Sequence, residues 1–216
     1  LELYTSEGCS SCPPADRWFT RLAESPGLWH SVVPVAFHVD YWNYLGWPDR
    51  FASTRYSDRQ RNYRRQGITH GVYTPGMVLA GNEWHEWRRG AAPAIAPETA
   101  GELSLTVDGS AFEADFEGGA EDNVQHLAIL GFGLESPVQR GENRGRLLRH
   151  DFVVLAHQVY KPEQGEWRGA LPEAPLADEA ERLGVAAWIS RGKRNPPLQA
   201  VGGWLPGQAL SPLTGN

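Results

Sequence analysis

The first forty residues change from a strand-like to a helix-like pattern of hydrophobic positions and back. Leu1–Thr5 alternates as a strand does. After a turn rich in Ser and Gly, apolar residues recur at helical spacing, at Ala15, Trp18, Phe19, Leu22 and Ala23. Val35–Asp40 then alternates again. This order predicts a strand, a turn, a helix and a second strand, which together begin an α/β unit.

An aromatic and Arg-rich insertion follows at Tyr41–Gln66, and its second part, Ser57–Gln66, has a helical pattern. Residues 77–87 then predict a β-hairpin that turns at Gly81-Asn82.

The second half of the chain has strand patterns throughout. Leu103–Val107 and Phe112–Phe116 alternate on either side of an Asp-Gly turn at Asp108-Gly109. Strand-length apolar segments recur at His126–Leu130, Asp151–Tyr160 and Gly184–Ser190. This spacing predicts an all-β sandwich of about seven strands.

Charge and aromatic content divide the chain at the same place. The 216 residues suit one or two compact units. The first 100 residues carry ten Arg against ten acidic residues, so the net charge of −6 falls in the second half. Fifteen of the 23 aromatic residues precede residue 101, and Ala91–Pro97 forms an Ala/Pro-rich connector. We therefore expect two domains, residues 1–100 and 101–216.

The two cysteines, Cys9 and Cys12, lie three positions apart at the start of the predicted helix. A helix N-terminus stabilises a thiolate, so Cys9 is the expected nucleophile. Cys12, which we expect to be the more buried, would resolve the mixed disulfide. One such pair is too few to form a disulfide scaffold, which favours a role in chemistry.

Strand, CxxC, helix, strand, Thr-Pro and β-hairpin is the order of a thioredoxin-like domain. In such a domain Pro75 would follow a cis peptide bond, and the backbone of Thr74 would pair with a substrate strand. The predicted fold is therefore an α/β thioredoxin-like domain followed by an all-β sandwich-like domain, α+β overall. A structural disulfide, a buried thiol pair and a metal site are the alternatives for the cysteines.

Several segments resemble a known family. They are Leu3–Asp16, Phe37–Trp47, Tyr73–Val78 and, further on, Arg140–Gly145 with His150–Val154. These segments are similar to the bacterial family catalogued as domain of unknown function 1223, a group of secreted thioredoxin-like proteins. The resemblance implies the fold, an exported location and a redox-type CxxC pair, and it supplies no substrate.

Three polar residues are candidates for a proton relay to the thiols. His38 and Asp40 end the second strand, where side chains reach the carboxyl edge of an α/β sheet. Glu2 precedes the cysteines on the first strand and could serve as a buried proton acceptor. The alternatives are structural, because a strand-end Asp commonly caps a turn and a strand His commonly bonds within the core.

The aromatic insertion supplies candidate substrate contacts at Tyr41, Trp42 and Trp47. These rings would form a hydrophobic wall for an extended or partly unfolded substrate, or else extend the core. The Arg-rich part of the insertion predicts a solvent-exposed helix face. Gly141–Gly145 predicts a hairpin loop, because it lacks the Lys and the strand-to-helix context of a phosphate loop.

These observations predict a thiol–disulfide oxidoreductase that acts on a protein or on a small thiol or disulfide and needs no cofactor. One alternative is a soft-metal protein that holds copper or zinc with the cysteine pair, with or without His38; the other is a non-catalytic binding module on a thioredoxin scaffold. The short supply of soft ligands, one thiol pair and the single methionine Met77, speaks against the soft-metal protein.

The net charge argues against nucleic acid, and no apolar run approaches the roughly 18 residues of a membrane helix. The chain opens on Leu1, which a removed signal peptide or an arbitrary start of the sequence would both explain. Together with the family resemblance, this start predicts a periplasmic or secreted protein.

Overall fold

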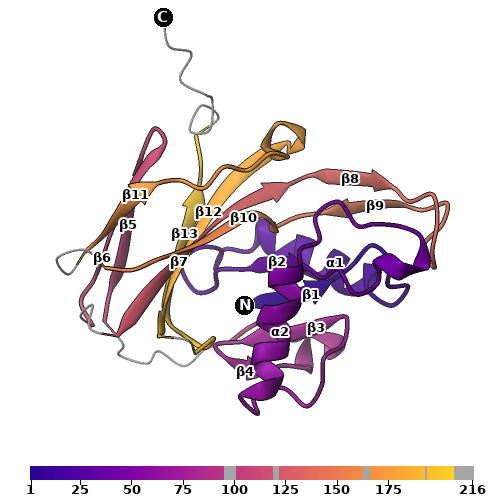
Figure 1. Cartoon of the computed structure of the whole chain (residues 1–216), viewed down its shortest axis with the longest axis horizontal. Helices are drawn as coiled ribbons and strands as arrows, with labels where there is room; N and C mark the ends of the chain where they lie inside the picture. The colour runs from indigo at the N-terminus through magenta and orange to yellow at the C-terminus, as the bar shows by residue number, and fades with distance from the viewer. Residues whose placement is uncertain (95–100, 119–121, 163–165, 193, 207–216) are drawn as a thin grey trace, which may run out of the picture.

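The computed structural model describes residues 1–94, 101–118, 122–162, 166–192 and 194–206. Within these ranges the chain is mostly β (Figure 1). The strands are β1 (Glu2–Thr5), β2 (Val35–His38), β3 (Gly76–Leu79), β4 (Asn82–Glu83), β5 (Leu103–Asp108), β6 (Ala111–Phe116), β7 (Asn123–Phe132), β8 (Leu134–Pro137), β9 (Leu147–His150), β10 (Val153–Tyr160), β11 (Trp167–Ala170), β12 (Arg182–Arg191) and β13 (Pro197–Trp204). The α-helices are α1 (Pro13–Thr20) and α2 (Thr54–Arg65), and short 3₁₀ helices cover Arg21–Glu24, Asn43–Leu45, Glu86–Arg89 and Ala177–Glu179.

Eight strands form one mixed sheet in the order β13-β12-β7-β10-β2-β1-β3-β4. β1 runs parallel to β2, with Thr5 opposite His38. β10 is also parallel to β2, and Val153 pairs with Ala36. Strand β2 is therefore where the two halves of the chain join, with the early strand β1 on one side and the later strand β10 on the other (Figure 1).

The predicted fold class, an α/β thioredoxin-like domain followed by an all-β sandwich-like domain, is wrong. The described chain is built around the eight-stranded mixed sheet and has only two α-helices, which is not a thioredoxin fold. The physical reason is strand pairing. An open strand edge carries unpaired backbone groups. The open edge of β2 is paired by β10, and β7, β12 and β13 extend the same sheet instead of forming a sandwich of their own.

Strand β7 shows how the large sheet is covered on both faces. Leu127 and Ile129 belong to a core shared with β5, β6 and β11, which form a separate three-stranded sheet. Ala128 and Leu130 belong to the core that includes α1, α2, β1 and β2. Because successive strand residues point to opposite faces, this alternation buries both sides of β7.

The two α-helices contact β1 through residues whose side chains point to opposite faces of the strand. Tyr63 of α2 donates a hydrogen bond to Glu2 (2.6 Å). Thr5 donates one to Asp16 of α1 (2.7 Å). Residues an odd number apart on a strand point to opposite faces, so α1 and α2 lie on opposite sides of β1. The polar residues of this strand are thereby divided between two separate environments.

Most predicted elements are present, with two hairpin turns shifted by one residue. The β5–β6 hairpin is present, but it turns one residue later than predicted, because Asp108 pairs with Ala111 and leaves Gly109 and Ser110 as the turn residues. Residues 141–145 lie in the β8–β9 hairpin loop, as predicted. The other hairpin turns one residue earlier than predicted, because Leu79 pairs with Asn82 and leaves Ala80 and Gly81 as the turn residues. The predicted domain boundary near residue 100 adjoins residues 95–100, which lie outside the described residues. Among the helices described, none is both long and apolar enough to cross a bilayer.

Candidate functional site

Cys9 and Cys12 are joined by a disulfide immediately before α1. Cys12 is the N-cap residue of the helix, and its carbonyl oxygen accepts hydrogen bonds from the N–H groups of Ala15 (2.8 Å) and Asp16 (3.0 Å). Cys9 is 1% exposed and Cys12 0%, so the expected difference in burial is small. Ser10, between them, is exposed. In the CxxC turn, Ser10 is therefore exposed to solvent while both cysteines are buried.

Trp42 connects the CxxC turn to Thr74 and Pro75. Its indole Nε1 donates a hydrogen bond to Thr74 Oγ1 (2.8 Å). A Cβ placed on Gly8 would lie only 2.9 Å from the Cβ of Trp42, so the Cβ of Trp42 packs directly against the backbone of Gly8. The Thr74–Pro75 peptide bond is cis, as expected. Pro75 leads into β3, which pairs with β1, and β1 in turn leads into the CxxC turn.

The loop between β8 and β9, residues 138–146, is here called the hairpin tip. It reaches the CxxC turn from the second half of the chain. The buried side chain of Asn143 donates through Nδ2 to the carbonyl oxygens of Glu7 (2.8 Å) and Cys9 (2.9 Å). Oε2 of Glu142 accepts a hydrogen bond from the N–H of Ser10 (3.0 Å). The hairpin loop is confirmed, whereas its contact with the cysteines was not predicted.

Five buried ionisable side chains gather next to this turn. We call them the acid–histidine cluster: Glu7, Asp16, His38, Asp49 and His150. His38 Nδ1 lies 2.7 Å from Asp49 Oδ2, and His150 Nε2 lies 3.6 Å from Glu7 Oε1. The two imidazole rings are 4.9 Å apart and nearly perpendicular. The N–H of Glu7 also donates to Asp49 (2.9 Å), which links the cluster to the segment that carries Cys9.

Burial and opposite charges compete in setting the protonation of the cluster. Burial lowers the pKa of His38, but Asp49, together with Asp16 and Glu7, outweighs this effect and leaves the pKa raised. Burial raises the pKa values of Asp49 and Glu7, but His38 and His150 respectively leave them lowered. Burial raises the pKa of Asp16, and here it prevails. Asp16 is therefore the carboxyl group of the cluster that holds a proton most readily.

Of the three relay candidates, His38 lies in the cluster. Its Nε2 has no hydrogen-bond partner among the described residues. Asp40 instead accepts hydrogen bonds from the hydroxyl groups of Thr54 and Ser57 at the start of α2. This arrangement favours the capping interpretation of Asp40.

Glu2 lies on the α2 side of β1, in an ion pair with Arg59. The Arg59 guanidinium binds both carboxylate oxygens, at 2.7 and 2.8 Å. Tyr4 and Tyr63 each donate a hydroxyl group to the same carboxylate at 2.6 Å. Burial raises the pKa of Glu2, but Arg59 leaves it lowered. A carboxylate with this many donors is stabilised in its charged form, which favours a structural role.

The three predicted substrate contacts are half-buried, and each is held by its polar end. Tyr41 donates its hydroxyl group to Gln60 of α2 (3.0 Å). Trp47 Nε1 donates to Glu7 Oε2 (2.6 Å), so this ring and Trp42 border the CxxC segment. Their role in binding substrate stays a prediction.

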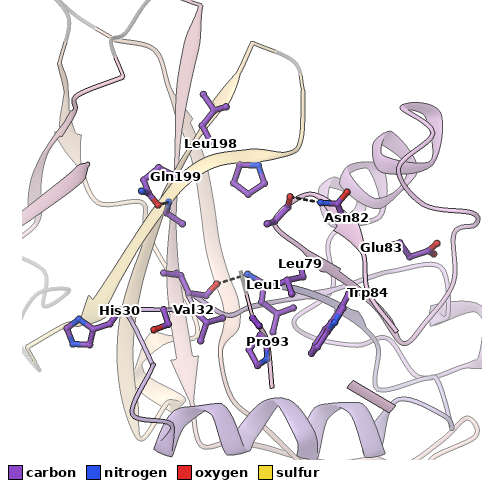
Figure 2. Close-up of a pocket in the computed structure, with 16 residues that line it drawn as sticks. Leu1, His30, Val32, Leu79, Asn82, Glu83, Trp84, Pro93, Leu198 and Gln199 are labelled. Atoms are coloured by element: carbon purple, nitrogen blue, oxygen red, sulfur yellow. Dashed lines mark hydrogen bonds between the residues drawn. The ribbon is translucent and has the colours of Figure 1, made fainter. Parts of the chain in front are cut away.

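A separate cavity of about 790 Å³ lies between the two edges of the large sheet (Figure 2). Its lining joins Leu198 of β13 to Leu79 and Trp84 of the β3–β4 region, with Val32 and Leu1 between them. None of the predicted site residues lines it. Across all the described ranges, the acid–histidine cluster included, no group of three or more His, Cys, Asp or Glu side chains is placed to hold a metal ion.

Six residues at this site were not predicted from the sequence: Glu7, Asp16, Asp49, Glu142, Asn143 and His150. Asp16 carried a signal, since it follows Cys12 by one helical turn and shares its face of α1. No local sequence signal marks Asp49 or Asn143. Asp49 contacts Glu7 from 42 residues away, and Asn143 contacts Cys9 from 134 residues away.

The structure thus defines a β-rich protein with a disulfide-bonded CxxC turn set against a buried acid–histidine cluster. The chain belongs to the family described as "Protein of unknown function (DUF1223)", whose model matches residues 1–190. Among solved structures it is similar to the crystal structure of a protein from Agrobacterium tumefaciens, with 26% identity and a TM-score of 0.62. That similarity covers 94% of this chain and 91% of the other. No curated protein matches the chain.

Proposed function

We propose that this protein is a thiol–disulfide oxidoreductase that exchanges disulfides through Cys9 and Cys12. The observation that carries the proposal is the Cys9–Cys12 disulfide at the start of α1. A disulfide stabilises a fold mainly by closing a long loop in the unfolded chain. These two residues are only three positions apart, so their bond has little to gain as a structural link and is better suited to exchange.

The exchange uses only the two cysteines and the substrate. The Cys9 thiolate attacks one sulfur of a substrate disulfide, forms a mixed disulfide and releases the other substrate sulfur as a thiolate, which takes up a proton. The Cys12 thiolate then attacks Cys9 Sγ, closes the Cys9–Cys12 bond and releases the second substrate thiol. Two electrons pass to the substrate, and the reverse sequence oxidises a substrate dithiol.

Asp16 is the group best suited to exchange the proton of Cys12. It lies one helical turn after Cys12, and its buried carboxyl group has a raised pKa. A general acid or base works best when its pKa is close to the working pH. His38 and His150 lie close enough to Asp16 to lower its pKa by their charge, so protonation of Asp16 depends on the rest of the cluster.

We place this reaction outside the cytoplasm, in the periplasm or the medium. The proposal rests on the family resemblance of the sequence and on the pairing of both cysteines in one disulfide. Disulfides persist in oxidising compartments and are rare in the cytosol. Fractionation of cells that express the natural gene tests this location, and recovery of the protein in the cytosol with reduced thiols would refute it.

Trapping of the mixed disulfide tests the chemistry. After reduction and exposure to glutathione disulfide, Cys12→Ser should retain one glutathione on Cys9, detected by mass spectrometry. Cys9→Ser is the matched control and should retain far less. The wild-type pair should equilibrate with glutathione in a titration. Failure of Cys12→Ser to form the adduct, together with a potential far below the glutathione couple, would establish a structural disulfide instead.

A further inference from the structure

The hairpin tip places an acidic residue on the backbone of the CxxC turn. Oε2 of Glu142 accepts the N–H of Ser10, the residue that directly follows Cys9. This N–H is a backbone donor of the turn, next to the hydroxyl group of Ser11, which lies 3.3 Å from Cys9 Sγ. The N–H of Cys9 is bonded to the carbonyl oxygen of Ser6, and that of Cys12 to the carbonyl oxygen of Cys9. A thiolate at Cys9 is stabilised by free N–H groups and destabilised by a nearby negative charge.

The position of Glu142 is fixed by its neighbour. Asn143 is fully buried and donates to the carbonyl oxygens of Glu7 and Cys9, while its Oδ1 accepts from Arg146 (3.0 Å). On the other side, Gly141 has a φ of 75°, which allows the chain to turn at this point. Glu142 is itself exposed, yet its backbone is anchored directly beside the cysteines.

From this geometry we propose that Glu142 is a positioning residue that restrains Cys9, because its carboxylate occupies the Ser10 N–H and sets a negative charge beside the nucleophile. This inference rests on the proposed function and adds to it a restraint on the reactivity of Cys9. The residue that applies the restraint lies in the second half of the chain, 132 residues after Ser10. The bond of Ser10 to Glu142 must break before its N–H can stabilise a thiolate.

Two substitutions separate the charge from the hydrogen bond. Glu142→Gln removes the charge and keeps an oxygen acceptor for Ser10, whereas Glu142→Ala removes both. Glu135→Gln is the matched control, since Glu135 is exposed on β8 of the same hairpin and lies 3.8 Å from Arg149. It changes the net charge by the same amount without a contact to the CxxC turn.

The first measurement is the thiolate titration of Cys9, followed by ultraviolet absorbance in protein reduced with dithiothreitol. Glu142→Gln should lower the midpoint by about half a pH unit, a factor of about three, and Glu142→Ala by at least as much. The shift should shrink at high salt, because screening weakens the interaction of exposed charges. Glu135→Gln should leave the midpoint unchanged.

The second measurement is the equilibrium of the Cys9–Cys12 pair with glutathione. A more stable thiolate favours the reduced form, so Glu142→Gln should shift this equilibrium toward the dithiol by about threefold. Unchanged midpoint and equilibrium in both Glu142 variants, or an equal change in Glu135→Gln, would overturn the role of Glu142. A wild-type pair that forms no mixed disulfide would instead refute the proposed function, while the titration of the reduced protein would still decide whether Glu142 acts on Cys9.

Discussion

The side-chain amide of Asn143 donates a hydrogen bond to the carbonyl oxygen of Cys9 at 2.9 Å. The same Nδ2 donates to Glu7, two residues earlier, at 2.8 Å. One side chain from the second half of the chain thus holds the backbone on both sides of Gly8. The packing of Trp42 against Gly8 holds the same segment from another direction.

Asn143→Ala should therefore destabilise the protein. It leaves two buried carbonyl groups without their donor, and an unsatisfied buried polar group costs about 1–3 kcal/mol. We expect a loss of at least about 2 kcal/mol in the free energy of unfolding, measured with urea, and faster alkylation of reduced Cys9. Asn82→Ala, which removes an exposed bond to Ala80, is the control and should change little. Equal effects of the two substitutions would contradict this assignment.

Asp16→Asn should slow exchange and stabilise the fold at the same time. Folding raises the pKa of the Asp16 carboxyl group. The protein therefore becomes less stable as the pH rises from the unfolded to the folded pKa of this group, because the carboxyl group ionises first in the unfolded chain. Asn removes this loss and keeps an acceptor for Thr5. We expect greater stability near neutral pH, and a rate of disulfide exchange at least about tenfold lower with an altered pH profile.

The control for that prediction is Asp58→Asn, at an exposed position on α2. Loss of both stability and activity in Asp16→Asn would indicate structural damage. An unchanged rate would show that another group carries the proton.

His38 should stabilise the protein most at low pH. Its raised pKa means that the charged imidazole is favoured in the fold. This contribution is complete below the unfolded value of about 6.5 and is lost as the pH rises through the folded pKa. The stability difference between wild type and His38→Gln should therefore shrink as the pH rises above about 6.5. In an Asp49→Asn background the same comparison should show little pH dependence, and a difference that grew with pH would contradict the ion pair.

Glu2→Gln should separate stability from chemistry. Glu2 is 7% exposed and its carboxylate pairs with Arg59, and removing one partner of a buried pair costs about 3–5 kcal/mol. We expect a large loss in the free energy of unfolding with an unchanged potential of the Cys9–Cys12 pair. Arg61→Gln, which removes an exposed pair with Asp58, should cost no more than about 1 kcal/mol. A shifted potential in Glu2→Gln would restore Glu2 as a proton acceptor for the thiols.

The hydrogen bond between Trp42 and Thr74 should couple the two segments energetically. Trp42→Phe removes the indole donor and Thr74→Val removes the hydroxyl acceptor. A double-mutant cycle on the free energy of unfolding should give a coupling of about 1 kcal/mol. Additive effects would show that the two side chains are merely neighbours.

Local structure was largely predictable from the sequence, and pairing between distant strands was not. The alternation at Leu103–Val107 correctly predicted β5, and helical spacing after Cys12 correctly predicted α1. The same alternation cannot specify which edge a strand joins. The parallel pairing of Val153 with Ala36 joins strands from both halves of the chain in one sheet, which their alternation alone did not indicate.

The candidate site was predictable to the same extent. Cys9, Cys12 and the cis bond before Pro75 follow from short motifs, and the structure brings them to adjacent segments. Glu142 and Asn143 could not be found in this way, because nothing local ties a hairpin loop to a turn more than a hundred residues earlier.

Because Ser10 and Glu142 are far apart in the sequence, the ribosome makes the CxxC turn well before the residue that binds it. The CxxC turn leaves the ribosome 132 residues before the carboxylate that binds it. The hydrogen bond between Ser10 and Glu142 can therefore form only after the hairpin tip has been synthesised, when the segment that carries both cysteines has long been complete.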